Sequence, residues 1–413
     1  MQNIGSLISG PWTSAARGAN LLDDDGQAVP TVFARMSALA ARTGALNLGQ
    51  GFPDTDPPTA VAEAAITAIR EGHNQYPPGL GTPELRGAIA AHQRHWYGLD
   101  WDPETEVLVT AGATEALAAT LLAFVSPGDE VLTLEPFYDA YAAVIALAGG
   151  VHRTVPLKFD TDADGDLRIG VDPAALRAAI TDRTRVILVN SPHNPTGLML
   201  SDEALTAIAA AAQEHDALIV TDEVYEHLTY SRPHRPVASL PGAAERTISI
   251  SSAGKTLSVT GWKIGWVCAR PELITAVLAV KQWLTYVSGG PFQPAVATGL
   301  QLPDEVFAGI AQDLREKRDL LLDGLRAAGL RVAVPEAGYF VVADAAPLGV
   351  RDAEQLCEEL PQRAGVVAIP LSAFCSPSTA PDAASMLRFA FCKDRATLEE
   401  AARLLAAWGR AGG

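Results

Sequence analysis

Lys255 is the residue whose type and surroundings first suggest covalent chemistry. It stands between Gly254 and Thr256, shortly after the expected strand 247–250, at a predicted junction of strand and loop. A lysine amine becomes a nucleophile when burial or neighbouring cations lower its pKa, and it then forms a Schiff base with an aldehyde. Because a lone lysine is more often a solvated surface charge, the other polar segments decide between the two interpretations.

Asp222 directly follows an apolar stretch, 217–221. We expect its carboxylate to be buried and therefore to need a partner. A protonated pyridine nitrogen would satisfy it, and Tyr225 is close enough along the chain to donate to a phenolate oxygen. The alternative interpretation of Asp222 and Glu223 as metal ligands is less favoured, because no histidine or further acid falls at a helpful spacing. We therefore expect no metal site.

A glycine-containing turn, Gly112-Ala113-Thr114, precedes a predicted helix. Free N–H groups and the positive end of the helix dipole favour a phosphate at such a position. Taken alone, an ordinary N-cap by Thr114 is the commoner explanation. Ser252 and Lys263 supply further donors. Lys263 is the natural cation for a phosphate if Lys255 is the nucleophile.

The elements that must position these residues alternate between strand and helix from about residue 60. Short strands rich in Val, Leu and Ile predict a largely parallel sheet covered by helices, with ligands beyond the carboxyl ends of its strands. The expected helices are 61–70, 83–96, 114–124, 138–147, 173–180 and 202–215, and the expected strands are 107–110, 131–134, 151–155, 185–189, 217–221, 247–250 and 264–269.

The C-terminal part has a different pattern, in which a long amphipathic helix, 305–327, leads into an α+β arrangement. A helix 31–42 is expected near the N-terminus; the later elements are strands 332–334, 339–343 and 387–391 and a helix near 353–359. We predict a large domain over 60–300 and a small α+β domain over 301–413. Residues 1–59 would form an N-terminal arm and part of the small domain.

Composition excludes several classes of function. The 413 residues are 48% hydrophobic and 19% charged, as in a folded protein, and 31 basic against 48 acidic residues give a net charge of −17. Such a charge argues against nucleic acid and anionic lipid as partners. The sequence has no apolar run of 18 residues, no secretory pattern at its N-terminus and no C-x-x-C pair among its four cysteines. These features predict a cytoplasmic protein without a zinc ligand set or membrane span.

Five motifs resemble those of the class I/II aminotransferases of fold type I, which use pyridoxal 5′-phosphate (PLP), and the resemblance extends over nearly the whole chain. They are NSPHNPTG (190–197), TDEVYEHL (221–228), SSAGKT (251–256), TGWKIGW (260–266) and LRFAFCK (387–393). Further stretches, 46–54, 74–86, 135–141 and 281–297, are similar to actinobacterial N-succinyldiaminopimelate aminotransferases and to kynurenine, glutamine and methionine aminotransferases. The resemblance implies an α/β fold with a mostly parallel central sheet and a smaller α+β domain.

The resemblance implies a role for each matching residue around the cofactor ring. Lys255 would hold PLP covalently and later move a proton between the substrate Cα and the cofactor. Asp222 would pair with the pyridinium nitrogen, which keeps the ring an electron sink. Asn194 and Tyr225 would contact the ring oxygen, and Tyr138 would stack on the ring face.

At the phosphate, the resemblance implies Ala113, Thr114, Ser252 and Lys263 as ligands within the chain. Tyr76 would reach the phosphate from a second subunit. A homodimer with shared active sites is therefore implied.

On the substrate side, Arg388 matches the arginine that grips the α-carboxylate, for which its planar fork is suited. Gly51 would add a backbone contact, whereas Asn190 is equally well a turn residue or a ligand. Tyr286 and Phe292, expected near the partner's site, leave room for a long or partly apolar side chain. No second arginine is evident for a side-chain carboxylate, so a strictly dicarboxylic donor is not expected.

The reaction implied is transamination in two half-reactions between an amino acid and a 2-oxo acid such as 2-oxoglutarate, with ping-pong kinetics. The favoured donor is N-succinyl-LL-2,6-diaminopimelate, in lysine biosynthesis; kynurenine, glutamine or methionine is the alternative. β-Elimination from cysteine conjugates is a further possibility on the same scaffold. A non-catalytic regulatory domain is less favoured, because no helix-turn-helix segment or basic patch precedes the fold and Lys255, Asp222 and Arg388 are all present.

Overall fold

The computed structural model describes residues 10–23, 25–163 and 165–412, and its centre is a seven-stranded sheet. Its strands are β2 (Val107–Thr110), β3 (Glu130–Glu135), β4 (Val151–Pro156), β7 (Thr184–Asn190), β8 (Leu218–Asp222), β9 (Thr247–Ser252) and β10 (Gly265–Cys268). They lie in the order β2-β10-β9-β8-β7-β3-β4. β10 is antiparallel to both neighbours and every other adjacent pair is parallel, so the predicted mostly parallel sheet is confirmed.

Helices cover both faces of this sheet because successive side chains of each strand point to opposite sides. Val186 and Leu188 of β7 share a core with α5 (Gly112–Phe124), α6 (Asp139–Leu147) and α10 (Pro271–Lys281). Ile187 and Val189 face α7 (Pro173–Ala179) and α8 (Asp202–Glu214) instead. The helices α3 (Thr59–Arg70), α4 (Pro83–Tyr97) and α11 (Phe292–Leu300) cover the β2 end, and α1 (Trp12–Gly18) packs on α6.

A second, four-stranded sheet forms from the C-terminal residues. It has the order β11-β12-β15-β14 and is antiparallel throughout. Its strands are β11 (Arg331–Ala333), β12 (Phe340–Asp344), β14 (Ile369–Pro370) and β15 (Met386–Ala390), and the helices beside it are α2 (Val32–Thr43), α13 (Ala353–Ala364) and α14 (Arg395–Arg410). β1 (Leu46–Asn47) pairs with β13 (Val366–Val367), so an N-terminal segment packs with the C-terminal elements.

Most expected elements occur within a few residues of their predicted bounds. The sequence did not predict the helices α1, α9 (Ala253–Thr256), α10, α11 and α14, the short strands β1, β13 and β14, or the hairpin of β5 (Lys158–Thr161) and β6 (Leu167–Gly170). The domain boundaries at 60 and 300 stay predictions. Residues 1–9, on which the expectation of no secretory leader depends, lie outside the described residues. Within the described ranges, none of the helices combines the length and apolar character needed to cross a bilayer.

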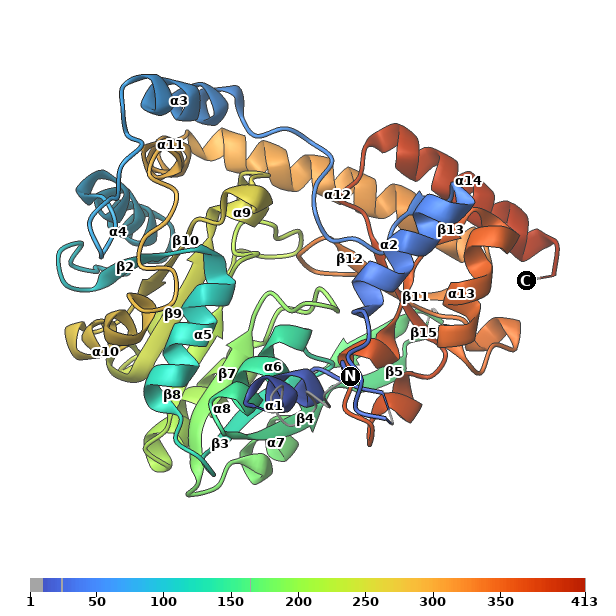
Figure 1. Cartoon of the computed structure of the whole chain (residues 1–413). Helices are drawn as coiled ribbons and strands as arrows, with labels where there is room; N and C mark the ends of the chain where they lie inside the picture. The colour runs from blue at the N-terminus through green and yellow to red at the C-terminus, as the bar shows by residue number, and fades with distance from the viewer. Residues whose placement is uncertain (1–9, 24, 164, 413) are drawn as a thin grey trace, which may run out of the picture.

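The long helix α12 (Asp304–Ala327) runs from beside the large sheet to the small one (Figure 1). Its C-terminal half packs closely on α14. At Gly324 an added Cβ would lie 2.5 Å from the Cβ of Ala402 and 2.6 Å from its Cα. At Gly309, on the same helix, an added Cβ would meet nothing within 4 Å. The two glycines therefore have opposite tolerance for a side chain.

We predict that Gly324→Ala lowers the free energy of unfolding by about 1–3 kcal/mol, because the helices must separate to admit the methyl group. Gly309→Ala is the matched control, and it should leave stability unchanged or raise it by up to about 1 kcal/mol through helix propensity. Thermal denaturation of the two PLP-loaded variants checks this. Equal midpoints would contradict the packing argument.

Candidate active site

A cavity of about 310 Å³ lies where β7, β8 and β9 end and the helix α5 begins. This is the edge at which ligands bind in open α/β sheets. Eleven of the fourteen predicted site residues line it: Gly51, Ala113, Thr114, Tyr138, Asn194, Asp222, Tyr225, Ser252, Lys255, Lys263 and Arg388. Strands distant in sequence therefore bring the predicted groups to one place.

Asp222 and Lys255 are the two central titratable groups of the cavity. Asp222, 5% exposed, accepts a hydrogen bond at Oδ2 from the Tyr141 hydroxyl at 2.7 Å, and no ion pair to it is recorded within the described ranges. Burial raises the pKa of Asp222. Burial lowers the pKa of Lys255, whose Nζ lies 5.7 Å from the ring centroid of Tyr339 and 5.9 Å from that of Tyr225. A lysine with a lowered pKa has the property that a nucleophilic amine requires.

Asn190 fixes the loop that follows β7. Its Nδ2 donates to the carbonyl oxygens of Pro192 at 3.1 Å and Asp222 at 2.9 Å, and its Oδ1 accepts from the Asn194 N–H at 2.6 Å. Of the two interpretations open for Asn190, these bonds support the turn residue. They also hold Asn194 beside the end of β8.

The start of α5 is suited to bind an anion. Its N-cap is Ala111, whose side chain has no hydrogen-bonding group, so an N-cap by Thr114 is wrong. Gly112 and Lys263 both have positive φ, and the Lys263 Nζ lies 3.3 Å from where a Cβ on Gly112 would be. A flexible ammonium group therefore lies beside a helix N-terminus, where backbone N–H groups and the helix dipole favour a phosphate.

Arg388 of β15 is a buried cation, 1% exposed, without a carboxylate partner among the ion pairs of the described residues. Nη2 donates to the Gly49 carbonyl at 2.9 Å and Nη1 to Asn194 Oδ1 at 3.3 Å, while Nε has no partner. The guanidinium carbon lies 3.9 Å from the ring centroid of Phe340 and 4.6 Å from that of Phe374. Burial lowers the pKa of Arg388 to about 10, which leaves it charged at neutral pH and available to a ligand carboxylate.

Gly51 lines the same cavity and packs on Phe340, the ring that also contacts Arg388. A Cβ there would lie 2.4 Å from Cζ of Phe340, so the close approach requires glycine. Its carbonyl accepts from the Tyr339 hydroxyl at 2.6 Å. Sequence reasoning missed the contributions of Phe33, Tyr141, Tyr339, Phe340 and Phe374. Tyr141 lies within a quoted motif and Phe340 in a predicted strand, but apolar periodicity indicates core packing and does not distinguish a cavity wall.

Tyr76, Tyr286 and Phe292 do not line this cavity. Tyr76 is 81% exposed, and its ring centroid lies 5.5 Å from that of Tyr286, which is also exposed. Phe292 stacks on Trp262 with centroids 4.7 Å apart. The chain alone does not bring these three residues to the site, and their roles stay predictions.

The donor set fits PLP. An anion site with a lysine, a buried carboxylate and an amine of lowered pKa line the same cavity, which matches a phosphate, a protonated ring nitrogen and an aldehyde. The carboxylate of Asp222 in particular needs a positive partner, which a pyridinium would supply.

Comparison with known proteins identifies close relatives. Residues 43–405 match the family model described as aminotransferase class I and II. The chain is 52% identical to the probable N-succinyldiaminopimelate aminotransferase DapC of Mycobacterium tuberculosis (strain ATCC 25618 / H37Rv), over 91% of this chain and 95% of that protein. It is 37% identical to the methionine aminotransferase of Escherichia coli (strain K12), again over 91% and 95%.

Solved structures agree with these matches. The N-succinyldiaminopimelate aminotransferase of M. tuberculosis superposes with a TM-score of 0.88, covering 92% of this chain and 97% of that one at 52% identity. The aspartate aminotransferase of Thermus thermophilus with maleate gives 0.82 at 33% identity, covering 95% and 98%. These matches, together with the site, confirm the fold type, the reaction class and the cofactor. The chain belongs to the class I and II aminotransferases and is a PLP-dependent enzyme that acts on amino acid and 2-oxo acid substrates.

Proposed function

We propose that this aminotransferase exchanges the amino group of N-succinyl-LL-2,6-diaminopimelate with 2-oxoglutarate in a ping-pong reaction. The observation behind the proposal is the 52% identity over 91% of the chain to a protein named for that donor, against 37% for a methionine and 36% for a kynurenine aminotransferase. Among the residues that line the cavity, Arg388 forms no ion pair with a carboxylate, and several others are aromatic. Such a cavity suits an α-carboxylate attached to a long, partly apolar side chain.

Each residue of the site has its own role in this reaction. PLP, when bound, withdraws electrons from the substrate Cα. Lys255 binds it and, through Nζ, takes and returns the proton at that carbon, which its lowered pKa permits. Asp222, held by Tyr141, keeps a proton on the ring nitrogen. Asn194 and Tyr225 orient the ring oxygen.

The remaining cavity residues bind and orient. Ala113, Thr114, Ser252 and Lys263 would hold the phosphate at the start of α5, and Tyr138 would pack against the ring. Arg388 would bind the substrate α-carboxylate through Nη1 and Nε, and Gly51 would add a backbone contact. A cytoplasmic location is part of the proposal, supported by four buried cysteines that are all free thiols.

We predict that N-succinyl-LL-2,6-diaminopimelate bleaches the visible absorbance of the PLP-loaded enzyme, and that 2-oxoglutarate restores it. The same titration with methionine, kynurenine and glutamine ranks the alternative donors by the rate of bleaching. A cysteine conjugate that yields pyruvate and ammonia without any 2-oxo acid would reveal β-elimination. Faster bleaching by methionine or kynurenine than by the succinylated donor would refute the proposed substrate.

Arg388→Lys should lower kcat/KM for the amino donor about 10- to 100-fold, because one charge-assisted hydrogen bond contributes about 1.5–3 kcal/mol and lysine cannot reproduce the fork. Arg395→Lys is the control, since Arg395 is half exposed and pairs with Glu316 outside the cavity. Steady-state kinetics on both variants, with PLP content measured, checks the assignment. An Arg388→Lys enzyme as efficient as the control would contradict it.

We also propose a homodimer with shared active sites, in which Tyr76 reaches the phosphate of the partner subunit. The support is a group of exposed apolar side chains that a monomer would leave in water: Tyr76, Trp283, Leu284 and Tyr286. Contiguous exposed apolar side chains mark interaction surfaces.

If sites are shared, mixing inactive Lys255→Ala with impaired Tyr76→Ala should restore activity. Each mixed dimer then holds one intact site, so random exchange returns roughly a quarter of wild-type activity. The control is the same mixture measured before subunits exchange. A mixture that never exceeds the sum of its components, despite mixed dimers seen by mass spectrometry, would argue that each chain completes its own site.

A further inference from the structure

A second cluster of polar side chains lies between α4 and the turn that follows Asp222. Its members do not line the catalytic cavity. It comprises His92 of α4 with Glu226 and His227, and each offers a ligand atom within 4.8 Å of the others. The Nε2 atoms of the two histidines are 2.7 Å apart. None of these residues has a task in the reaction described above.

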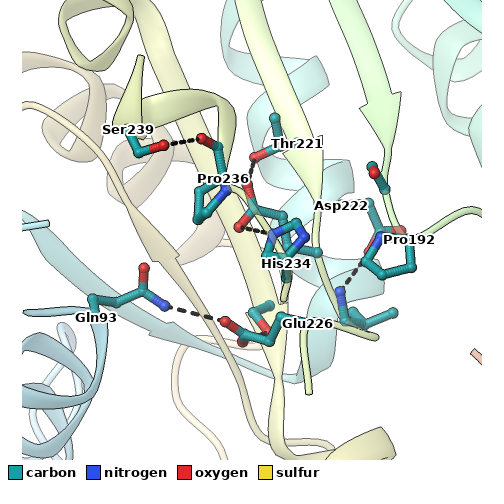
Figure 2. Close-up of polar contacts among 12 residues, drawn as sticks. Gln93, Pro192, Thr221, Asp222, Glu226, His234, Pro236 and Ser239 are labelled. Carbon is teal, nitrogen blue, oxygen red and sulfur yellow. Dashed lines mark hydrogen bonds and ion pairs between the residues drawn. The ribbon is translucent and has the colours of Figure 1, made fainter. Parts of the chain in front are cut away.

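Glu226 is a buried carboxylate whose hydrogen-bond donors are neutral. It is 4% exposed and accepts from the Ser251 hydroxyl and, at 3.4 Å, from Gln93 Nε2, whose amide points at it in Figure 2. Among the described residues no lysine or arginine forms an ion pair with Glu226. The ionised form of such a buried carboxylate is costly without compensation, and a cation beside it would offset the cost.

The two histidines are suited to supply the rest of a coordination shell. His92 is 3% exposed, and its Nδ1 is buried without a hydrogen-bond partner. Two imidazole nitrogens and one carboxylate are a ligand set that Zn²⁺ accepts, with water in the fourth position. The neighbouring acid Glu223 is already engaged by His234 at 3.1 Å and Thr221 at 2.7 Å, so it is not part of the set.

A cavity of about 370 Å³ lies beside the cluster and is separate from the catalytic one. Glu226 and His227 are in its wall, together with Trp96, Tyr97 and Phe307. It gives an ion a route inward and leaves room for a water ligand.

We propose that His92, Glu226 and His227 bind one Zn²⁺ ion, which would tie α4 to the turn containing Asp222 and Tyr225. Sequence spacing predicts no such site, because His92 is far from Glu226 in the chain and only the fold brings them together. The ion would link two segments distant in the chain and keep one position open for water. The proposal that Zn²⁺ binds here does not depend on which amino acid is the donor.

Equilibrium dialysis of the chelator-treated, PLP-loaded enzyme against Zn²⁺ tests the site. We expect one ion per chain, with affinity at least about tenfold weaker in His227→Gln and in Glu226→Gln. The matched control is His215→Gln, because His215 also pairs with a carboxylate, that of Asp182 at 3.1 Å, but at the surface. It should bind as the wild type does. Equal binding by His227→Gln and the wild type would overturn the proposal.

Binding of Co²⁺ to the wild-type enzyme is a second, independent test, and it does not require any variant to fold. One equivalent should produce the visible bands of four-coordinate cobalt, and Zn²⁺ should remove them. Bands that persist in His92→Gln, or their absence from the wild type, would also overturn the proposal.

Discussion

The site depends on one costly arrangement, the burial of the Asp222 carboxylate without a basic partner. Tyr141 donates one hydrogen bond to it, and Asn190 binds the backbone carbonyl of the same residue. These contacts fix the group at the end of β8 but do not neutralise it. A cofactor with a protonated ring nitrogen does so, and therefore binds the folded state preferentially. The same carboxyl edge of the sheet includes Ser252, the last residue of β9, and Lys255 follows three residues later in α9. The sheet therefore brings Asp222 and Lys255 to one cavity.

Arg388 is the complementary case, a buried cation without a carboxylate. A backbone carbonyl, an amide oxygen and two aromatic rings hold it in place. Because Arg388 and Asp222 are each held by separate neutral partners, they do not neutralise one another, and both charges remain for ligands. Lys255 and Lys263 also line the cavity, so its basic side chains outnumber its one lining carboxylate within a chain of net charge −17. Net charge describes the field around a protein and does not determine the sign of a single site.

Much of this site could be predicted from sequence because strand ends in a parallel sheet converge. Lys255, Asp222 and Asn194 each follow a predicted strand, and these positions taken together predict that the three residues lie at one edge of the sheet. Phe374 and Tyr339 could not be assigned in this way, since their roles arise from packing between segments distant in the chain. Thr114 was ambiguous as a cap because the backbone at Ala111 decides where the helix begins. Tyr76 does not line the cavity of its own chain, and no pattern within one chain can place a residue in the site of another.

The division of the site between two sheets explains why the reaction is easier to infer than the donor. Asp222 and Ser252 line the cavity from the carboxyl edge of the large sheet. Arg388 comes from the small sheet, and the segment of Gly49 and Gly51 is held there by Arg388 itself and by Tyr339. Side chains around that segment can differ without disturbing the bonds to Asp222. Family motifs therefore indicate the reaction class, whereas the donor depends on side chains around the segment of Gly49 and Gly51, which the motifs do not specify.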